Sequence, residues 1–599
     1  FIRLTILRKE SEVKIVTKRI RMYGIVQGVG FRPAVARHAM RCGIRGYVCN
    51  YGSFVEIIAQ ADEKQADTFI QAVCTEPPER AEIIRTQVET LSSSENAPLS
   101  SCADIPIFED FSITESTPAD GEIFIPPDIA ICDDCRRELY DQKDRRYLHP
   151  FINCTQCGPR LTILESLPYD RERTSMKEFP MCPACDEEYH DPKSRRYDAQ
   201  PVCCSDCGPE VYILPVPDKN IPRLTGSEAI SFARKLLCEG GIVAVKGIGG
   251  FHLACNAADE QAVRRLRELK HRPVKPFAVM MKDMETVRRE CRIDAVHEHY
   301  LNDHRKPILL LDRSASGRLA GSIAPGNPSV GVMLPYAPLQ LLLFDYPDGI
   351  TMPDMLVMTS GNISGAPICR NDEEALAQIG SFCDAILSHN RTIRTRADDS
   401  VMDLFDGRPY MIRRSRGYSP LPVSVEAGFS GRVLAMGGEL KNTFCIGIDD
   451  LFYPSSYIGD LADRRSVRAL KETIERYRGF LNLENLQAVA CDLHPAYHSV
   501  QLASAYGLPV IQVQHHYAHI LSCMAENGRT EPVLGASFDG TGYGTDGTIW
   551  GGEILYADTK GFRRLGHICS FPHTGGDLAS REGWRIAVSM LQHYGQQNE

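Results

Sequence analysis

The chain has 599 residues, of which 43% are hydrophobic and 24% charged, and its formal net charge is −10. This is an ordinary globular composition, and the length is sufficient for several hydrophobic cores. The acidic balance excludes a basic surface over the whole molecule. It argues against nucleic acid as a partner, although a local basic patch is compatible with it. The longest apolar stretch, residues 333–344, contains prolines and is shorter than the ~20 residues of a membrane span, so no membrane partner is expected.

The N-terminus and the cysteines bear on the cellular compartment. Residues 1–11 are charged and lack the apolar segment of a secretory signal peptide, which predicts a cytoplasmic protein. Because the chain begins with Phe1, we expect the sequence to be a fragment at its front end. Many of the 22 cysteines stand in CxxC pairs, which favour metal binding in a chain without an export signal. The alternative is a secreted protein with disulfides.

After an N-terminal extension of residues 1–14, alternating apolar and polar residues predict a small α+β domain over residues 15–112. The expected strands are residues 13–23, 46–50 and 54–59, and the expected helices are residues 33–41 and 66–76. Residues 87–104 are polar with little pattern, and we expect them to be the exit from this domain.

A glycine-rich segment, residues 24–33, stands between the first expected strand and helix. Its backbone N–H groups and the helix N-terminus favour an anion, and Arg32 can grip a phosphate with two nitrogens. Asn50, at the end of the next strand, is placed to orient a water. A bare structural turn is the alternative.

The same segment resembles acylphosphatase, through Val-Gln-Gly-Val-Gly-Phe-Arg at residues 26–32, Gly-Tyr-Val-Cys-Asn at residues 46–50, and Gly52. The resemblance implies a ferredoxin-like fold and hydrolysis of an acyl phosphate to phosphate and a carboxylate or carbamate. It implies that Arg32 and the loop amides hold the phosphoryl group and that Asn50 positions the attacking water. The phosphate-loop residues are Gln27, Gly28, Val29, Gly30 and Phe31.

Residues 126–210 are rich in Cys, Arg and Tyr and have poor periodicity, so something other than a core must hold them. Four CxxC pairs occur here, and eighteen residues separate the first from the second and the third from the fourth. Two such pairs complete a tetrahedral four-cysteine site that favours zinc, whose binding free energy replaces the missing core. We therefore expect a tandem zinc module over residues 113–212 with two structural Zn²⁺ ions; redox CxxC motifs are the alternative. The expected ligands are Cys132, Cys135, Cys154 and Cys157 for one ion, and Cys182, Cys185, Cys204 and Cys207 for the other.

An internal repeat supports this module. Residues 146–159 recur, fifty residues later, as residues 196–209. The alignment of the two copies selects Cys204 rather than its neighbour Cys203 as a ligand.

Helical patterns alternate with apolar strands over residues 213–425 and predict an α/β domain. The expected helices are residues 227–237, 259–270 and 372–379, and the expected strands are residues 242–246, 276–281, 308–311 and 355–359. A glycine turn at residues 247–250, a cation cluster with Lys270 and Arg272, and a loop with Ser360 and Asn362 could surround a nucleoside triphosphate. A solvated basic loop is the alternative.

These motifs resemble the YrdC/TsaC family, which adenylates a carbamate with ATP. The resemblance implies that Lys270 and Arg272 neutralise phosphate charge, that Ser360 and Asn362 hold phosphate or acyl-adenylate oxygens, and that ATP binds with Mg²⁺. Polar residues at 390–400 and 413–417 stand near the end of this domain, either at the nucleotide or in structural ion pairs.

Prolines and glycines in residues 417–431 predict a linker, and strand patterns alternate again over residues 432–599, in a domain expected to span residues 426–599. The expected strands are residues 432–436, 444–448, 488–492, 510–514 and 533–538. His515 and His519, four apart at a helix onset, share one face and can chelate one ion, whereas His516 should point elsewhere. An ordinary surface or core pair is the alternative. Asp539 begins a glycine-rich turn that suits a carboxylate ligand and a phosphate.

This last region resembles the ASKHA-type carbamoyltransferase domain related to TsaD. The resemblance implies that His515, His519 and Asp539 bind iron or zinc. The family continues through a further lobe that carries another metal-binding Asp, so we expect an incomplete domain and transferase site here.

The whole is expected to be multidomain, α+β and α/β: a ferredoxin-like acylphosphatase domain, a tandem four-cysteine zinc module, a YrdC-like α/β domain and a partial ASKHA-like domain. Their order resembles the carbamoyltransferase family of NiFe-hydrogenase maturation. The resemblance implies that carbamoyl phosphate is hydrolysed, that the carbamate is adenylated with ATP, and that the carbamoyl group passes to the C-terminal Cys of HypE as precursor of a cyanide ligand. Such a path benefits from enclosure, because free carbamate decomposes readily. The alternatives are an enzyme of tRNA threonylcarbamoyl-adenosine synthesis and a zinc-ribbon nucleic-acid-binding scaffold.

Overall fold

The computed structural model describes residues 15–595, apart from residues 27–28, 52–53, 79, 92–107, 116–123, 217–218, 220, 426–427 and 580–581. The chain divides into two compact units. Unit 1 consists of residues 1–421 with 455–457 and 471–482, and unit 2 consists of residues 422–454, 458–470 and 483–599. Among the described helices, none is both long enough and apolar enough to cross a membrane.

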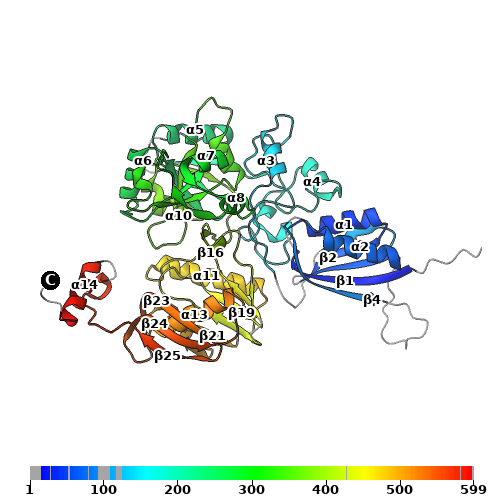
Figure 1. Cartoon of the computed structure of the whole chain (residues 1–599). Coiled ribbons are helices and arrows are strands. Elements are labelled where there is room, and N and C mark those ends of the chain that lie inside the picture. Colours follow the sequence, from blue (N-terminus) through cyan, green and yellow to red (C-terminus); the bar gives the residue numbers. More distant parts are fainter. Residues whose placement is uncertain are drawn as a thin grey trace, which may run out of the picture. The chain divides into compact units, whose positions relative to one another are not determined.

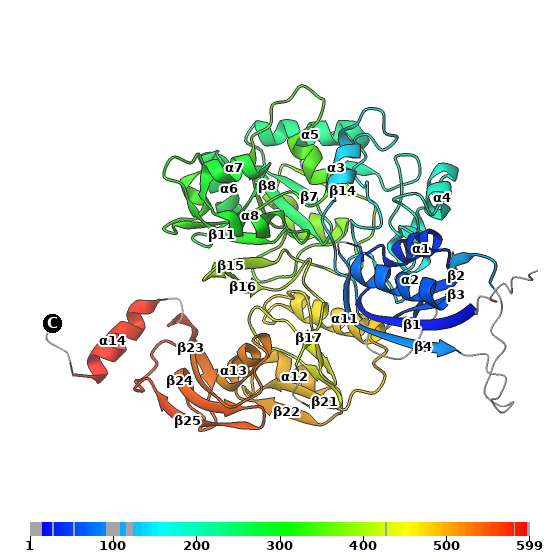
Figure 2. The same cartoon turned by 45° about the vertical axis from the view of Figure 1, so that its right-hand side comes forward.

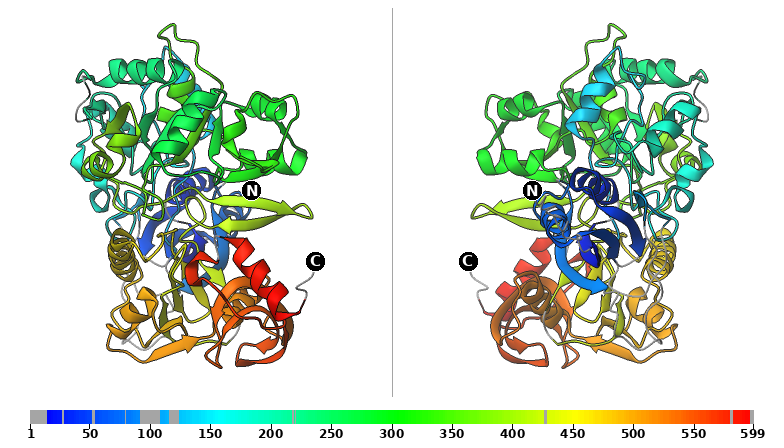
Figure 3. Two further views of the ribbon diagram at one scale, coloured as in Figure 1. Left: turned by 90° about the vertical axis from the view of Figure 1, so that its left-hand side faces the viewer. Right: turned by 90° about the vertical axis from the view of Figure 1, so that its right-hand side faces the viewer.

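Unit 1 begins with a five-stranded sheet in the order β4-β1-β3-β2-β5, which is a ferredoxin-like arrangement with one added strand. Two helices, α1 and α2, pack against each other and against the strands (Figures 1 and 3). The alternating strands bury Ile20, Met22, Val48, Val55 and Ile57 beneath these helices. The elements are β1 (Ile15–Ile25), α1 (Phe31–Cys42), β2 (Arg45–Tyr51), β3 (Phe54–Asp62), α2 (Glu63–Thr75), β4 (Glu82–Leu91) and β5 (Phe111–Ile113).

One expectation for this domain was wrong. Residues 87–91 belong to the edge strand β4, paired with β1, rather than to a patternless exit. An edge strand with a solvated face carries mostly polar residues, here Gln, Glu and Thr, and so lacks a strong alternation. Residues 92–104, the rest of that stretch, lie outside the described residues.

The cysteine-rich segment has little regular structure. We call residues 132–159 the first repeat and residues 182–209 the second repeat. Each begins with a short helix that follows its first cysteine, α3 (Asp133–Tyr140) and α4 (Pro183–His190), and Cys132 caps α3 by accepting from the N–H of Cys135. Two 3₁₀ turns, η1 (Arg171–Arg173) and η2 (Ser175–Glu178), lie between the repeats.

The central domain of unit 1 is an eleven-stranded mixed sheet in the order β16-β15-β11-β12-β9-β13-β8-β7-β14-β6, with β10 paired to β11. The expected helices and strands are present within two residues of their predicted ends. Strands β15 and β16 form a hairpin at one end of the sheet (Figure 2). The strands are β6 (Val211–Leu214), β7 (Val243–Lys246), β8 (Phe251–Asn256), β9 (Ala278–Met281), β10 (Cys291–Arg292), β11 (Ile308–Arg313), β12 (Ser329–Met333), β13 (Met355–Ser360), β14 (Ala385–His389), β15 (Val401–Phe405) and β16 (Arg408–Arg413). The helices are α5 (Gly226–Cys238), α6 (Glu260–Leu269), α7 (Met284–Glu290), α8 (Ala295–Asn302), α9 (Pro338–Phe344) and α10 (Asp372–Ile379), with the 3₁₀ turns η3 (Gly321–Ile323) and η4 (Gly380–Phe382).

Unit 2 holds a six-stranded sheet in the order β17-β20-β19-β18-β21-β22 and a three-stranded sheet in the order β23-β24-β25. Helix α13 packs on β23 and β24. The strands are β17 (Val423–Ser424), β18 (Arg432–Ala435), β19 (Cys445–Ile448), β20 (Leu451–Pro454), β21 (Ala488–Asp492), β22 (Val510–Val513), β23 (Val533–Tyr543), β24 (Ile549–Asp558) and β25 (Gly561–His567). The helices are α11 (Arg464–Phe480), which runs through both units, α12 (His498–Ser504), α13 (His515–Glu526) and α14 (Gly583–His593), preceded by the 3₁₀ turn η5 (Gly576–Leu578).

Two expectations for unit 2 need correction. The linker at residues 417–431 contains a short strand, β17, paired with β20. The expected glycine turn after Asp539 is part of strand β23, which continues to Tyr543 through an irregularity between Phe538 and Gly542. Glycines permit such a bulge as well as a turn, so the residue pattern alone does not separate the two.

Candidate functional site

The first candidate site gathers Arg32 and Asn50. Gly30, with φ 75°, ends the loop and caps α1, which places Arg32 in the first turn of that helix. With its amide oxygen turned toward Arg32, Asn50 accepts from the guanidinium nitrogens at 3.0–3.2 Å. Both side chains are buried. Val29 and Phe31 are buried in the same loop, whereas Gln27 and Gly28 lie outside the described residues.

The zinc module closes this site from its other side, which sequence reasoning missed. The Nη2 atom of Arg32 lies 3.2 Å from Asp170 Oδ1 and 3.0 Å from Asp198 Oδ2. A small cavity is lined by Arg32 and Asn50 together with Thr155, Arg160, Tyr169, Asp198, Ala199 and Gln200. A Cβ atom at Gly30 would meet Thr155 at 3.0 Å, so the loop and the module are in close contact.

The eight predicted cysteine ligands form two groups of four, and within each group the sulfurs lie within 4.8 Å of one another. The closest Sγ–Sγ distances are 3.7 and 3.9 Å in the first group and 3.6, 3.7 and 3.8 Å in the second. A tetrahedron with Zn–S bonds of about 2.3 Å has S–S edges of about 3.8 Å, whereas a disulfide needs about 2.05 Å. The donor sets therefore fit two tetrahedral zinc ions.

The two repeats exchange arginines. Arg145 of the first repeat donates to the sulfur of Cys185 in the second group at 2.8 Å. Arg195, fifty residues later, approaches the first group and donates to Glu138 on α3 at 2.7 Å. The next arginine in each repeat also forms an ion pair with the other repeat: Arg146 pairs with Glu188, and Arg196 pairs with Glu138. Each thiol group thus has a cation from the other repeat beside it.

The second candidate site lies at the C-terminal ends of α6 and β13. Lys270 Nζ donates to the backbone carbonyls of Ser360 and Asn362 at 2.8 and 2.9 Å, and it lies 3.3 Å from Asn362 Oδ1. Ser360 Oγ donates to Asn362 Oδ1 at 2.9 Å, and Arg272 donates to Thr359 Oγ1 at 3.2 Å. The fold therefore brings all four predicted nucleotide-binding residues together.

The electrostatics of this site favour an anion. The hydrogen-bond partners of Lys270 are uncharged oxygens, so its charge stays available to a phosphate. Burial, and then the charge of Arg272, lowers the pKa of Lys270 to about 7. Burial, and then the charge of Arg267, lowers the pKa of Arg272 to about 10. A bound polyphosphate would relieve both penalties.

The polar residues at the end of the central domain form ion pairs. Asp399 accepts from Arg416 at 2.9 Å and lies 2.9 Å from His252 Nε2, and all three are buried. Asp398 pairs with Arg413 at 3.1 Å. The charges of Asp398 and Arg413 also act on the pKa of Arg272, so this ion pair lies beside the second candidate site.

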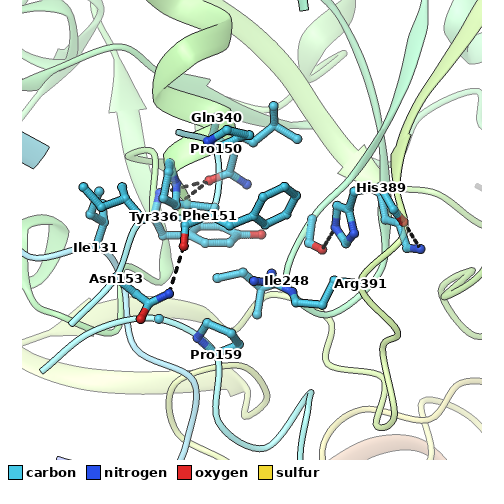
Figure 4. Close-up of a pocket in the computed structure, with 17 residues that line it drawn as sticks. Ile131, Pro150, Phe151, Asn153, Pro159, Ile248, Tyr336, Gln340, His389 and Arg391 are labelled. Atoms are coloured by element: carbon cyan, nitrogen blue, oxygen red, sulfur yellow. Dashed lines mark hydrogen bonds between the residues drawn. The ribbon is translucent and has the colours of Figure 1, made fainter. Parts of the chain in front are cut away.

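A further pocket lies between the cysteine-rich segment and the central domain (Figure 4). Phe151 packs edge-on against His389, with ring centroids 5.2 Å apart, and the Arg391 guanidinium lies 5.0 Å from the same ring. Lys246 also lines the pocket, and burial lowers its pKa to about 8. Gly247 and Ile248, from the glycine turn that the sequence suggested for a nucleotide, line this pocket, whereas Lys270, Arg272, Ser360 and Asn362 do not. Its walls come from five separate stretches of sequence, namely Ile131 and residues 150–159, 246–248, 336–340 and 389–391, so no single motif predicts it.

The third candidate site is in unit 2. His515 and His519 lie on one face of α13, 3.2 Å apart between their Nε2 atoms. Asp539 Oδ2, on β23, lies 3.1 Å from His515 Nε2 and 3.7 Å from His519 Nε2. Both Asp539 oxygens are buried, and the described residues give them no hydrogen bond of acceptable geometry. Oxygens and imidazole nitrogens that face one another in this way fit ligands around a cation.

Two neighbours complete this third site. Asp492, at the end of β21, lies 2.7 Å from His515 Nδ1, which fixes the ring so that Nε2 faces Asp539. His516 does not point away, as the sequence suggested, because its buried Nε2 lies 2.5 Å from Asp539 Oδ1. It leaves the helix on another face but reaches the second oxygen of the same carboxylate. The first contact joins β21 to α13 and the second joins β23 to α13, so neither follows from the local sequence.

Family models match the chain from one end to the other. Residues 18–99 match Acylphosphatase, residues 131–164 and 181–214 match the HypF finger, and residues 235–415 match the Sua5–YciO–YrdC model, described as Telomere recombination. Residues 429–526 match the HypF Kae1-like domain, and residues 535–599 match the second subdomain of the carbamoyltransferase Kae1-like domain.

Full-length relatives are similar over nearly the whole chain. Carbamoyltransferase HypF2 of Cupriavidus necator is 41% identical over 99% of this chain and 74% of its own length. Carbamoyltransferase HypF of Synechocystis is 42% identical over 96% of this chain and 72% of its own. A crystal structure of full-length HypF in the phosphate- and nucleotide-bound form has 42% identity and a TM-score of 0.90, covering 99% of this chain and 76% of that one. The structure of HypF from T. kodakarensis has a TM-score of 0.85 at 42% identity, covering 94% and 71%.

Proposed function

We propose, because this chain belongs to the HypF family of carbamoyltransferases, that its three candidate sites act in series on one carbamoyl group. The chain is an ATP-dependent carbamoyltransferase with an acylphosphatase domain. The multidomain fold expected from the sequence is confirmed by the family matches. The proposed domain boundaries remain residues 15–112, 113–212, 213–425 and 426–599.

In the first step, carbamoyl phosphate is hydrolysed at Arg32 and Asn50. The guanidinium and the N–H groups of the loop at residues 27–31 hold the phosphoryl oxygens at the N-terminus of α1. Asn50 orients the attacking water. The contact between Arg32 and Asn50 supports these roles, because it places a cation and a neutral amide within one hydrogen bond of each other.

In the second step, ATP with Mg²⁺ activates the carbamate as carbamoyl-AMP and releases pyrophosphate. Lys270 and Arg272 neutralise the phosphates, and Ser360 and Asn362 bind phosphate or acyl-adenylate oxygens. The low pKa of Lys270 and of Arg272 supports this assignment, since loss of solvation is the main cause of both shifts and both cations lie beside the C-terminal end of β13. The two four-cysteine groups hold structural zinc, which supplies no chemistry and replaces a hydrophobic core.

In the third step, the carbamoyl group passes from carbamoyl-AMP to the C-terminal cysteine thiolate of HypE with release of AMP, as precursor of the cyanide ligand of the NiFe centre. His515, His519 and Asp539 would hold a zinc or iron ion, which supplies Lewis acidity when bound. Asp492 keeps the Nε2 atom of His515 facing this site. We also propose a cytoplasmic location, because the described cysteines form no disulfide.

The observation that carries the proposal is that one compact unit contains both the Arg32–Asn50 pair and the Lys270–Asn362 cluster. The decisive experiment measures pyrophosphate release from ATP with carbamoyl phosphate, or with threonine and bicarbonate. We expect release that depends on carbamoyl phosphate. Release that depends on threonine would instead assign the chain to tRNA threonylcarbamoyl-adenosine synthesis.

Variants make this experiment specific. Arg32→Ala should abolish carbamoyl phosphate hydrolysis, whereas Arg37→Ala, an exposed arginine on the same helix, should retain it. Lys270→Ala should abolish pyrophosphate release but spare hydrolysis, with the exposed Arg264 of α6 as its matched control. Salt-sensitive retardation of RNA or DNA, with no pyrophosphate release, would favour the nucleic-acid scaffold.

A further inference from the structure

The most unexpected neighbour of Arg32 is a carboxylate from the second repeat. Arg32 and Asp198 are 166 positions apart in the sequence, yet Asp198 Oδ2 lies 3.0 Å from Arg32 Nη2. We propose that Asp198 is a built-in anion that competes with the acyl phosphate for Arg32 and so sets the affinity of this site. The inference rests on the proposed acyl phosphate hydrolysis at Arg32.

The first repeat supplies an internal comparison. Leu148 stands where the second repeat has Asp198, and their backbones match, with φ 56° and 57°. Their amides also make the same contact, Leu148 N–H to the carbonyl of Leu139 and Asp198 N–H to that of Tyr189. The repeat fold therefore accepts an apolar side chain at this position. The carboxylate is therefore not needed to form the repeat. Asp198 differs from Leu148 in its surroundings, because Arg32 of the neighbouring domain lies beside it.

The second repeat also aims this carboxylate. Asp198 Oδ1 accepts from Gln200 Nε2 at 2.9 Å and from the Tyr189 hydroxyl at 3.3 Å. Gln200 is itself buried and accepts from the Arg171 N–H at 2.7 Å, so this support is rigid. One oxygen of Asp198 is thus held by its own repeat, and the other, Oδ2, faces Arg32. Because each carboxylate oxygen of Asp198 has its own partners, the hydrogen-bond network fixes the orientation of this side chain toward Arg32.

Charge then determines how substrate enters. One guanidinium faces two carboxylates, because Asp170 Oδ1 lies 3.2 Å from the same Nη2 atom. An acyl phosphate carries negative charge, so it must displace Asp198 from Nη2 or meet its repulsion. Burial raises the pKa of Asp198 by more than the charge of Arg32 lowers it, and the nearby Asp170 carboxylate raises it further. Asp198 lines the cavity, whereas Asp170 does not, so Asp198 is the carboxylate that substrate would meet.

The consequence is a site that keeps its arginine in place without substrate. A lone buried guanidinium would be costly, and the second repeat supplies the counter-charge. The acyl phosphate then replaces the Asp198 carboxylate, a weaker partner, at the Arg32 guanidinium. Asp198 is a positioning residue of the second repeat, and its removal should tighten the binding of anions.

Two variants and one control test this. Asp198→Asn keeps the size and the oxygen held by Gln200 and suits a positive φ. Asp198→Leu copies the residue that the first repeat has at the matched position. Glu187→Gln removes one negative charge from an exposed position of the same repeat. For each protein one measures the inhibition constant of inorganic phosphate, KM and kcat for carbamoyl phosphate hydrolysis, and the zinc content.

We expect Asp198→Asn and Asp198→Leu to lower the inhibition constant of phosphate and KM by about tenfold, the effect of one lost close charge contact of about 1.4 kcal/mol. The change in KM should exceed any change in kcat, while Glu187→Gln matches the wild type. A KM that stays within twofold of wild type, or rises, in a variant with full zinc content would overturn the inference. If the wild type hydrolyses carbamoyl phosphate while Arg32→Ala is equally active, the proposed function at Arg32 fails instead, and the inference with it.

Discussion

The Nη1 atom of Arg195, in the second repeat, lies 3.7 Å from the sulfur of Cys154, in the first. The reverse contact exists fifty residues earlier, where Arg145 lies 2.8 Å from Cys185. A cation beside metal-binding thiolates stabilises their charge, and groups just outside the ligands tune metal affinity strongly. Each repeat therefore supports the metal site of the other.

The exchange predicts coupled zinc sites. Arg195→Ala should raise the rate at which a chromophoric chelator removes zinc from the first group, by about 10- to 100-fold if the effect follows metal affinity. Arg145→Ala should do the same for the second group. The exposed Arg137, on α3, provides the control, and its alanine variant should release zinc at the wild-type rate. Unchanged release from Arg195→Ala would contradict the coupling.

The ligand assignment predicts a metal count. Cys154→Ser should leave about one zinc ion per chain rather than two and should unfold the first repeat, since the ion replaces a core there. Cys203→Ser should retain both ions, because Cys203 is a buried neighbour of His149 and lies outside either group. Atomic absorption on the purified proteins measures both. Two ions in Cys154→Ser would disprove the ligand set.

The low pKa of Lys270 predicts how nucleotide affinity depends on pH. An ammonium group binds phosphate and a neutral amine does not, so affinity should be constant below about pH 7 and fall as pH rises above it. The slope should approach tenfold per pH unit, and burial is the main cause of the shift. Calorimetric titration of a non-hydrolysable ATP analogue from about pH 6 to 9 measures this.

Lys270→Met is the matched variant for that titration. It should bind the analogue weakly at every pH and should lack the decline that the wild type shows. A decline of equal slope in Lys270→Met would assign the titration to another group.

The contact between Asp492 and His515 predicts a supporting role in metal binding. Asp492→Asn should weaken zinc or iron binding to unit 2 by about 10- to 100-fold, because the amide no longer fixes the ring through a charged hydrogen bond. Competition with a chelator of known affinity measures the change. Glu526 is an exposed acid at the end of α13, the helix that carries His515, and Glu526→Gln should leave the metal affinity unchanged. Equal affinities in the two variants would remove Asp492 from the site.

The sequence predicted best what depends on short spacings. The strands and helices of the central domain, the four CxxC pairs and the helix face shared by His515 and His519 follow from local periodicity. The edge strand β4 was partly missed because its outward residues are polar.

What the sequence did not predict was contact between distant segments. Asp198 beside Arg32, the exchanged arginines and His516 on Asp539 each join positions that no motif connects. These contacts depend on how one domain or element packs against another. The substitution of Leu148 by Asp198 between the repeats was a visible signal, but it acquires meaning only when Arg32 is placed next to it.

The path of the chain through α11 affects the order in which the protein can fold during synthesis. Residues 471–482 belong to unit 1, although the residues around them belong to unit 2. Glu472 pairs with Arg370 at 3.0 Å, and Arg476 donates to Thr395 at 2.9 Å, so the central domain depends on this returning segment. A ribosome that has completed residue 421 has therefore not yet produced all of unit 1. The nascent central domain must wait for about sixty more residues before it closes, and a chaperone would find its unfinished surface exposed in that interval.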